Sequence, residues 1–186
     1  MKGKAMANGG ETVGRRANPW RIGAWSIAGL LLLIPAVAMQ FDSGVNWTAF
    51  DFLFAAGMIA IVGGAFELAV RATRNSAYRG GVGAALAAGF MIVWATGAVG
   101  MIGDEGDAYN LLFFAVILVA LGGAALARFR APGMAWAMAV AAAAHVAVAL
   151  AGMTMDPRGG LVSAAFGALW LLSAALFRKA ARAAGG

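Results

Sequence analysis

The chain of 186 residues has no cysteine, a single histidine and few charged side chains, which make up 12% of the sequence. The absence of cysteine excludes disulfides and thiolate metal sites. One histidine, His145, cannot supply the paired axial ligands of a membrane b-type haem. HExxH and GxSxG motifs are missing, and no lysine falls inside an apolar run, which excludes a retinal Schiff base. We therefore expect no enzyme, no cofactor and no metal site.

Apolar residues form 62% of the chain. A helix needs about 20 of them to cross about 30 Å of hydrocarbon. Six runs of this kind are found, at residues 20–39, 49–70, 82–102, 108–128, 133–154 and 160–177. The sequence thus predicts an all-α membrane protein with one six-helix transmembrane domain over residues 18–186, preceded by a mobile cytoplasmic tail, residues 1–17. Ala36-Val37-Ala38 also fits a signal-peptide cleavage site, which leaves a cleaved first run as an alternative.

Thirteen of the fourteen Lys and Arg residues fall on one side of these six runs. They are Lys2, Lys4, Arg15, Arg16, Arg21, Arg71, Arg74, Arg79, Arg128, Arg130, Arg178, Lys179 and Arg182; only Arg158 breaks the pattern. Short loops rich in Lys and Arg stay cytoplasmic, so both termini are predicted to be cytoplasmic. This asymmetry also accounts for the net charge of +6 without a nucleic-acid partner, and favours contact with anionic lipid.

The second and fourth runs resemble each other at a constant shift of 59 residues. Thr48 to Phe54 aligns with Asp107 to Phe113, and both runs continue without a gap to Gly-Gly-Ala. This predicts three consecutive helical hairpins in the same orientation, an internal repeat of a kind that some transporters use. Similar composition among apolar helices is the alternative explanation.

Small residues indicate where helices approach one another closely, because association in lipid depends on van der Waals contact. We expect helix contacts at Gly63, Gly64, Gly122 and Gly123, and at Gly97, Gly100 and Gly103 of the third run. The Ala-rich fifth run is predicted to be central. Aromatic residues near the outer ends of the second and fourth runs indicate lipid-facing positions; these are Phe52, Phe54, Phe113 and Phe114.

Two ionisable residues lie inside the apolar runs. Burying a charge in the membrane is costly, so each such residue is a candidate functional residue. His145 is near the middle of the fifth run. Its neutral ring is expected to bond a carbonyl or a buried water within the bundle, or else to sense pH or contact a ligand. Glu67 lies four residues before Arg71, the order that suits a helical ion pair; an ion- or proton-handling role is the alternative. These two are the candidate ligand or proton-handling residues.

The remaining acidic residues lie at helix starts. Asp51 with Thr48 resembles a capping box, and Asp107 and Asp156 can cap the fourth and sixth helices. The cluster from Asp104 to Asp107 could hold a divalent cation weakly, but lacks the spacing of an EF-hand. A solvated loop is the simpler interpretation.

The stretches Ala38 to Phe41, Val45 to Ala55, Phe66 to Arg71 and Val99 to Asn110 resemble a group of small uncharacterised bacterial membrane proteins. The resemblance covers about the first two-thirds of the chain and implies a multi-pass protein of a bacterial inner membrane. It carries no site residues. With the scarce intramembrane polarity, it favours a non-enzymatic scaffold or assembly component that contacts lipid, with a membrane-protein partner or its own copies as candidate partners. The alternative is a small solute or ion transporter or channel that uses His145 and Glu67.

Overall fold

The computed structural model describes residues 19–41 and 44–185, so the expected tail at residues 1–17 lies outside the described residues. The elements are α1 (Pro19–Ala38), α2 (Ala49–Ala72), α3 (Ser76–Ala98), the short 3-10 helix η1 (Ala108–Asn110), α4 (Leu111–Leu126), α5 (Ala131–Gly152) and α6 (Pro157–Ala184). The described chain contains no strand, and all six α-helices belong to segments long and apolar enough to cross a membrane. The predicted all-α class with six candidate spans is confirmed.

Two helices differ from their predicted ranges by more than three residues at an end. α3 begins six residues early because Asn75 caps it, its Oδ1 accepting the Tyr78 N–H at 3.0 Å. It also ends at Ala98, so the prediction that Gly100 and Gly103 lie on its packing face is wrong. Both glycines adopt positive φ, +77° and +69°, in the loop that follows. α6 continues to Ala184 and carries the last cluster of basic residues within its helix.

The described chain divides into two compact units, the first ending at Ala56 and the second beginning at Gly57. In the first, α2 starts with the predicted capping box: Asp51 Oδ2 accepts the Thr48 N–H at 2.7 Å, and the Asp51 N–H lies 3.4 Å from Thr48 Oγ1. One side of α1, formed by Ala28, Leu32, Pro35 and Ala36, is buried or half-buried. Large apolar side chains on the rest of the helix are exposed, among them Ile22, Ile27, Leu30, Leu31, Leu33, Ile34 and Val37.

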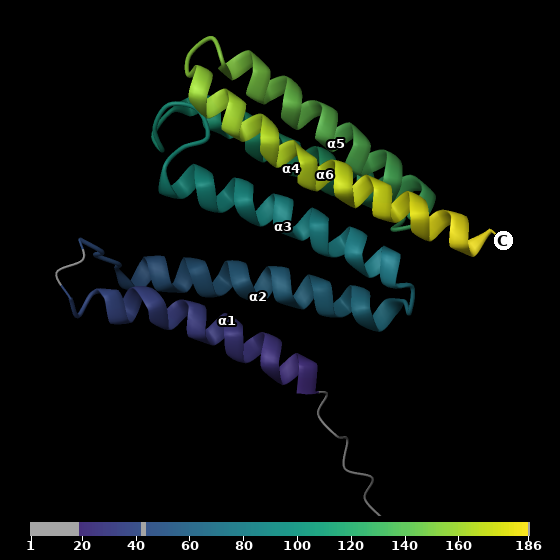
Figure 1. The fold of residues 1–186 in the computed structure, drawn as a ribbon, viewed down its shortest axis with the longest axis horizontal. Helices are drawn as coiled ribbons and strands as arrows, with labels where there is room; N and C mark the ends of the chain where they lie inside the picture. The colour runs from purple at the N-terminus through teal and green to yellow at the C-terminus, as the bar shows by residue number, and fades with distance from the viewer. Residues whose placement is uncertain (1–18, 42–43, 186) are drawn as a thin grey trace, which may run out of the picture. The chain divides into compact units, whose positions relative to one another are not determined.

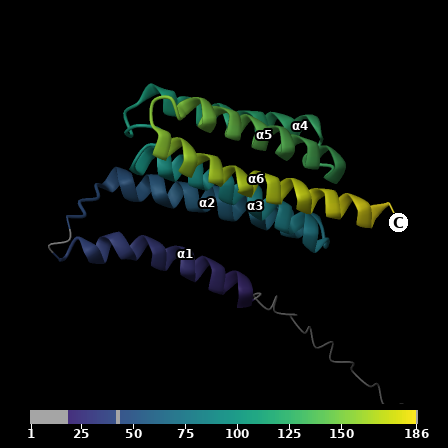
Figure 2. The same cartoon turned by 45° about the horizontal axis from the view of Figure 1, so that its top comes forward.

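In the second unit, α3, α4, α5 and α6 lie side by side (Figures 1 and 2). α5 packs against both α4 and α6, and α3 packs chiefly against α6. Within its span α5 buries 44% of its residues, the largest share of the six, as its small side chains predicted. The contact between α5 and α6 is the most extensive; the arrangement as three hairpins remains a prediction.

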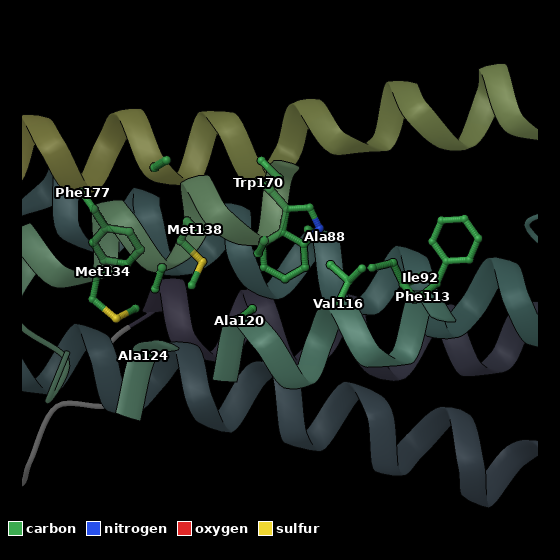
Figure 3. Packing of buried hydrophobic residues seen from close by; sticks show 14 of the residues in the cluster. Ala88, Ile92, Phe113, Val116, Ala120, Ala124, Met134, Met138, Trp170 and Phe177 are labelled. Atoms are coloured by element: carbon green, nitrogen blue, oxygen red, sulfur yellow. The ribbon is translucent and has the colours of Figure 1, made fainter. Parts of the chain in front are cut away.

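The core of this unit is filled by large side chains at three levels. Met134, Met138 and Phe177 gather at one end, Trp170 lies between, and Phe113 lies with Ile92 at the other (Figure 3). Small residues on the facing helices make room for them.

One of the predicted glycine contacts within the helices is present and three are not. A Cβ atom at Gly123 would lie 2.7 Å from the Ala137 Cβ, so α4 and α5 are in close contact there. A Cβ atom at Gly64, Gly97 or Gly122 would meet nothing within 4 Å in the described structure, and the prediction for these three is wrong. Adjacent helical residues point about 100° apart, so a Gly-Gly pair need not present both members to one neighbour.

The turn between α4 and α5 lies just before Ala131-Pro132-Gly133. Pro132 lies in the first turn of α5, where its missing N–H costs nothing. α4 ends at a Schellman-type turn, in which the Phe129 N–H donates to Ala124 O and the Arg128 N–H to Ala125 O. Arg128 and Phe129 have φ of +49° and +57°, a region that glycine normally fills and that costs other residues about 1–2 kcal/mol each. Tyr78 of α3 holds the turn, its hydroxyl donating to Phe129 O at 2.6 Å.

Candidate functional site

His145 is fully buried in the second unit and points into the bundle, as predicted. Its Nε2 lies 2.8 Å from the carbonyl oxygen of Ser163 on α6, so Nε2 carries the proton and donates. The ring lies 5.3 Å, centre to centre, from the ring of Phe113 on α4. The predicted carbonyl partner is confirmed, and it fixes the orientation of the imidazole.

A chain of hydrogen bonds leads from His145 to the loop after α3. Ser163 Oγ donates to Met101 O at 2.8 Å, and the Met101 N–H donates to Asn110 Oδ1 at 3.0 Å. Asn110 is 2% exposed and uses its whole amide: Oδ1 also accepts the Ile102 N–H, and Nδ2 donates to Ile102 O and Asp104 O. α4, α5 and α6 are thereby tied to one loop.

Asp156 fastens the same loop from the α6 side. Its Oδ1 accepts the Gly159 N–H at 2.9 Å, which caps α6 as predicted, and its Oδ2 accepts the Gly103 N–H at 3.3 Å. These backbone donors, that of Gly159 first, hold the pKa of the Asp156 carboxyl below its ordinary value. Asp107 accepts the Tyr109 N–H at 2.8 Å and so caps η1, the turn before α4, rather than α4 itself as predicted. Asp107 and Asp156 therefore serve helix starts, and no group of three potential metal ligands occurs among the described residues.

The prediction that Phe113 faces lipid is wrong, because its side chain is fully buried against His145. The prediction used only the position of Phe113 near the end of its apolar run. Whether its side chain is buried depends on which face of α4 packs against α5. Phe52 is half-buried, and Phe54 is exposed as expected.

Three buried polar atoms lack a hydrogen-bond partner within the described part of the chain: His145 Nδ1, Thr96 Oγ1 and Trp170 Nε1. With the proton on Nε2, His145 Nδ1 presents a lone pair and can accept one further hydrogen bond. A proton on Nδ1 would instead leave a positive charge in the core without a carboxylate, which is strongly unfavourable. The arrangement supports acceptance of a hydrogen bond more readily than storage of a proton.

Glu67 does not join this site. It pairs with Arg71 one turn later on α2, as predicted, and its side chain is 19% exposed. Close by, the Arg79 guanidinium donates to Val70 O and Thr73 O and so covers the last carbonyls of α2. Glu67 is near the start of α3 and the His145 network reaches past the end of α3, a helix about 35 Å long. The structure thus keeps the two candidate residues apart, since Glu67 lies near one end of the second unit and the hydrogen-bond network of His145 leads to the other.

Comparison with protein-family models, with curated proteins and with solved structures gives no match.

Two residues of the network were not recognised from the sequence. The shift of 59 residues aligns Asn110 with Asp51, yet Asp51 caps its own helix while Asn110 folds a loop. The sequence could have indicated the role of Asn110, because an amide side chain buried beside a long apolar run needs hydrogen-bond partners. Ser163 gave no such signal, because a serine in a helix can bond a carbonyl of its own preceding turn.

Proposed function

We propose that this protein is a non-enzymatic integral protein of a bacterial inner membrane, with six spans and both termini cytoplasmic, that acts as a scaffold or assembly component. Six apolar helices are compatible with an integral membrane protein. The charge asymmetry of the loops supports the orientation. The resemblance to small bacterial membrane proteins supports the location.

The observation that carries the scaffold role is the contrast between α1 and the second unit. Helices α3 to α6 bury a core of their own, whereas α1 leaves large apolar side chains exposed over about half of its circumference. A span with so much uncovered apolar surface offers it to lipid or to another membrane protein. We assign it to a protein partner, either a second copy or a different protein.

A photo-crosslinking amino acid at exposed positions of each unit tests this role in the native host. Leu31 on α1 is 54% exposed and Leu171 on α6 is 57% exposed, so the two positions are matched in burial. We expect a discrete protein adduct from position 31 and only lipid adducts from position 171. Lipid adducts alone from position 31, and from Leu30 and Ile34 beside it, would remove the support for scaffolding.

Transport is the second candidate, and the unpartnered His145 Nδ1, Thr96 Oγ1 and Trp170 Nε1 favour it, since polar atoms inside a bundle can line a path for water or a solute. Purified protein in liposomes distinguishes the two. Under the scaffold role, ion and proton flux equals that of empty liposomes. Under transport, pH-dependent flux is present and is abolished by His145→Leu while the protein stays folded.

A further inference from the structure

We infer that the groove between α4 and α5, at the end of the bundle that carries their connecting turn, binds an anionic phospholipid. The acyl chain lies in the groove and the headgroup phosphate meets Arg128 and Arg130. Such a lipid site is compatible with a scaffold and with a transporter alike.

The groove is apolar and has a volume of about 510 Å³, within the range of about 300–1,000 Å³ that ligand clefts have. Its floor is narrow because the two helices touch through small residues: Cβ atoms at Gly123 and Gly133 would lie 2.7 Å and 2.6 Å from the Cβ atoms of Ala137 and Ala127. Larger side chains rise on either side, Leu126 from α4 and Trp136 from α5, 88% and 73% exposed.

The direction of the groove suits a lipid. It begins at the end of α4 and reaches inward to Val119, seven residues or about 10 Å along the helix. An acyl chain that enters from the headgroup region follows the same course. Trp136, near the start of α5, lies where an indole ring meets both hydrocarbon and headgroups.

Charge at the mouth of the groove is positive and unneutralised. Arg128 and Arg130 are exposed, and neither makes an ion pair within the described residues. Apart from Glu67, which is paired with Arg71, the carboxylates of the second unit lie at the opposite end, at Asp104, Glu105, Asp107 and Asp156. A phosphate diester therefore finds two guanidinium groups and no competing carboxylate at the turn.

The backbone of the turn supports the same assignment. Arg128 occupies a left-handed conformation that glycine would adopt without strain, and Tyr78 helps to hold it there. Strain kept at an exposed position points to a use for the side chain. Phe129, 64% exposed between the two arginines, adds an apolar group at headgroup depth.

The test is native mass spectrometry of delipidated protein titrated with dioleoylphosphatidylglycerol, with dioleoylphosphatidylcholine as the zwitterionic comparison. We expect one phosphatidylglycerol to be retained in preference to phosphatidylcholine. Arg128→Gly removes the charge and relieves the backbone, so it should weaken phosphatidylglycerol binding about fivefold while thermal stability in lipid-free detergent is kept or raised. Arg130→Gln should weaken it similarly. Val140→Trp, which fills the groove, should weaken retention of both lipids.

Arg182→Gln is the matched control, because it removes one positive charge from α6 at the same end of the bundle and should leave binding unchanged. Equal binding of the two lipids, or an Arg128→Gly protein that binds phosphatidylglycerol like the wild type, would overturn the inference. So would an effect of Arg182→Gln as large as that of Arg128→Gly. A dimer that Val140→Trp dissociates, without bound lipid, would assign the groove to a second copy instead. Should Arg128→Gly fail to fold, Arg128→Gln decides.

Discussion

Ala137 on α5 lies against Gly123 on α4 so closely that any Cβ atom at position 123 would be 2.7 Å from the alanine methyl. The neighbouring Gly122 has open space where its Cβ would be. Two glycines adjacent in sequence therefore have opposite roles, and they form a matched pair for mutation.

We predict that Gly123→Leu destabilises the protein by about 1–3 kcal/mol through overpacking. Gly122→Leu should be neutral or stabilising by about 0.5–1 kcal/mol, since leucine is the better helix former. Thermal unfolding in one detergent measures both. Equal destabilisation by the two substitutions would show that α4 does not meet α5 through this face.

His145→Leu removes the hydrogen bond to Ser163 O and an imidazole fitted against Phe113. We expect a loss of about 1–3 kcal/mol in the free energy of unfolding. Ala143→Leu on the exposed face of α5 is the control and should change stability little. A His145→Leu protein as stable as the control would show that the imidazole is not held by this contact.

Asn110→Leu leaves the N–H groups of Met101 and Ile102 buried without their acceptor, at a cost of about 1–3 kcal/mol each. Hydrogen exchange over residues 99–107 should speed up, whereas exchange in the middle of α6 should hardly change. Glu105→Gln, in the exposed part of the same loop, is the control. Unaltered exchange in the loop would contradict the role assigned to Asn110.

Asp156 makes the stability of the protein depend on pH in the acidic range. Its folded-state pKa is lowered by the N–H groups of Gly159 and Gly103, so its stabilisation is present above the unfolded pKa of about 4 and is lost as pH falls through the folded value. Asp156→Asn keeps a capping side chain without the titration. Thermal midpoints measured from pH 7 to pH 3 should fall more steeply for the wild type than for Asp156→Asn. Parallel curves would contradict this coupling.

The orientation is tested by topology reporters. A reporter fused after Gly186 should be active only in the cytoplasm, and one inserted at the exposed Gly106 only on the other side. Activity of the first reporter outside would contradict this topology and favour an odd number of spans.

The membrane class and the number of helices were determined by the sequence alone, because hydrocarbon thickness fixes the length of each apolar run. Local chemistry also determined the helix starts at Asp51, Asp107 and Asp156, since a cap needs only residues two or three positions away. The pairing of Glu67 with Arg71 could be predicted for the same reason, because the two residues are only four positions apart on one helix.

Only the tertiary structure decided which face of each helix is buried. Neighbouring residues such as Gly122 and Gly123, or Phe113 and Phe114, face different directions around the helix axis and have different environments. The sequence does not show which of them is buried, because the helix is apolar on all sides. The chain from His145 through Ser163 and Met101 to Asn110 joins positions up to 62 residues apart, and no local pattern encodes such contacts. In lipid, where every face of a span can be apolar, close packing and partners for buried polar groups decide the arrangement.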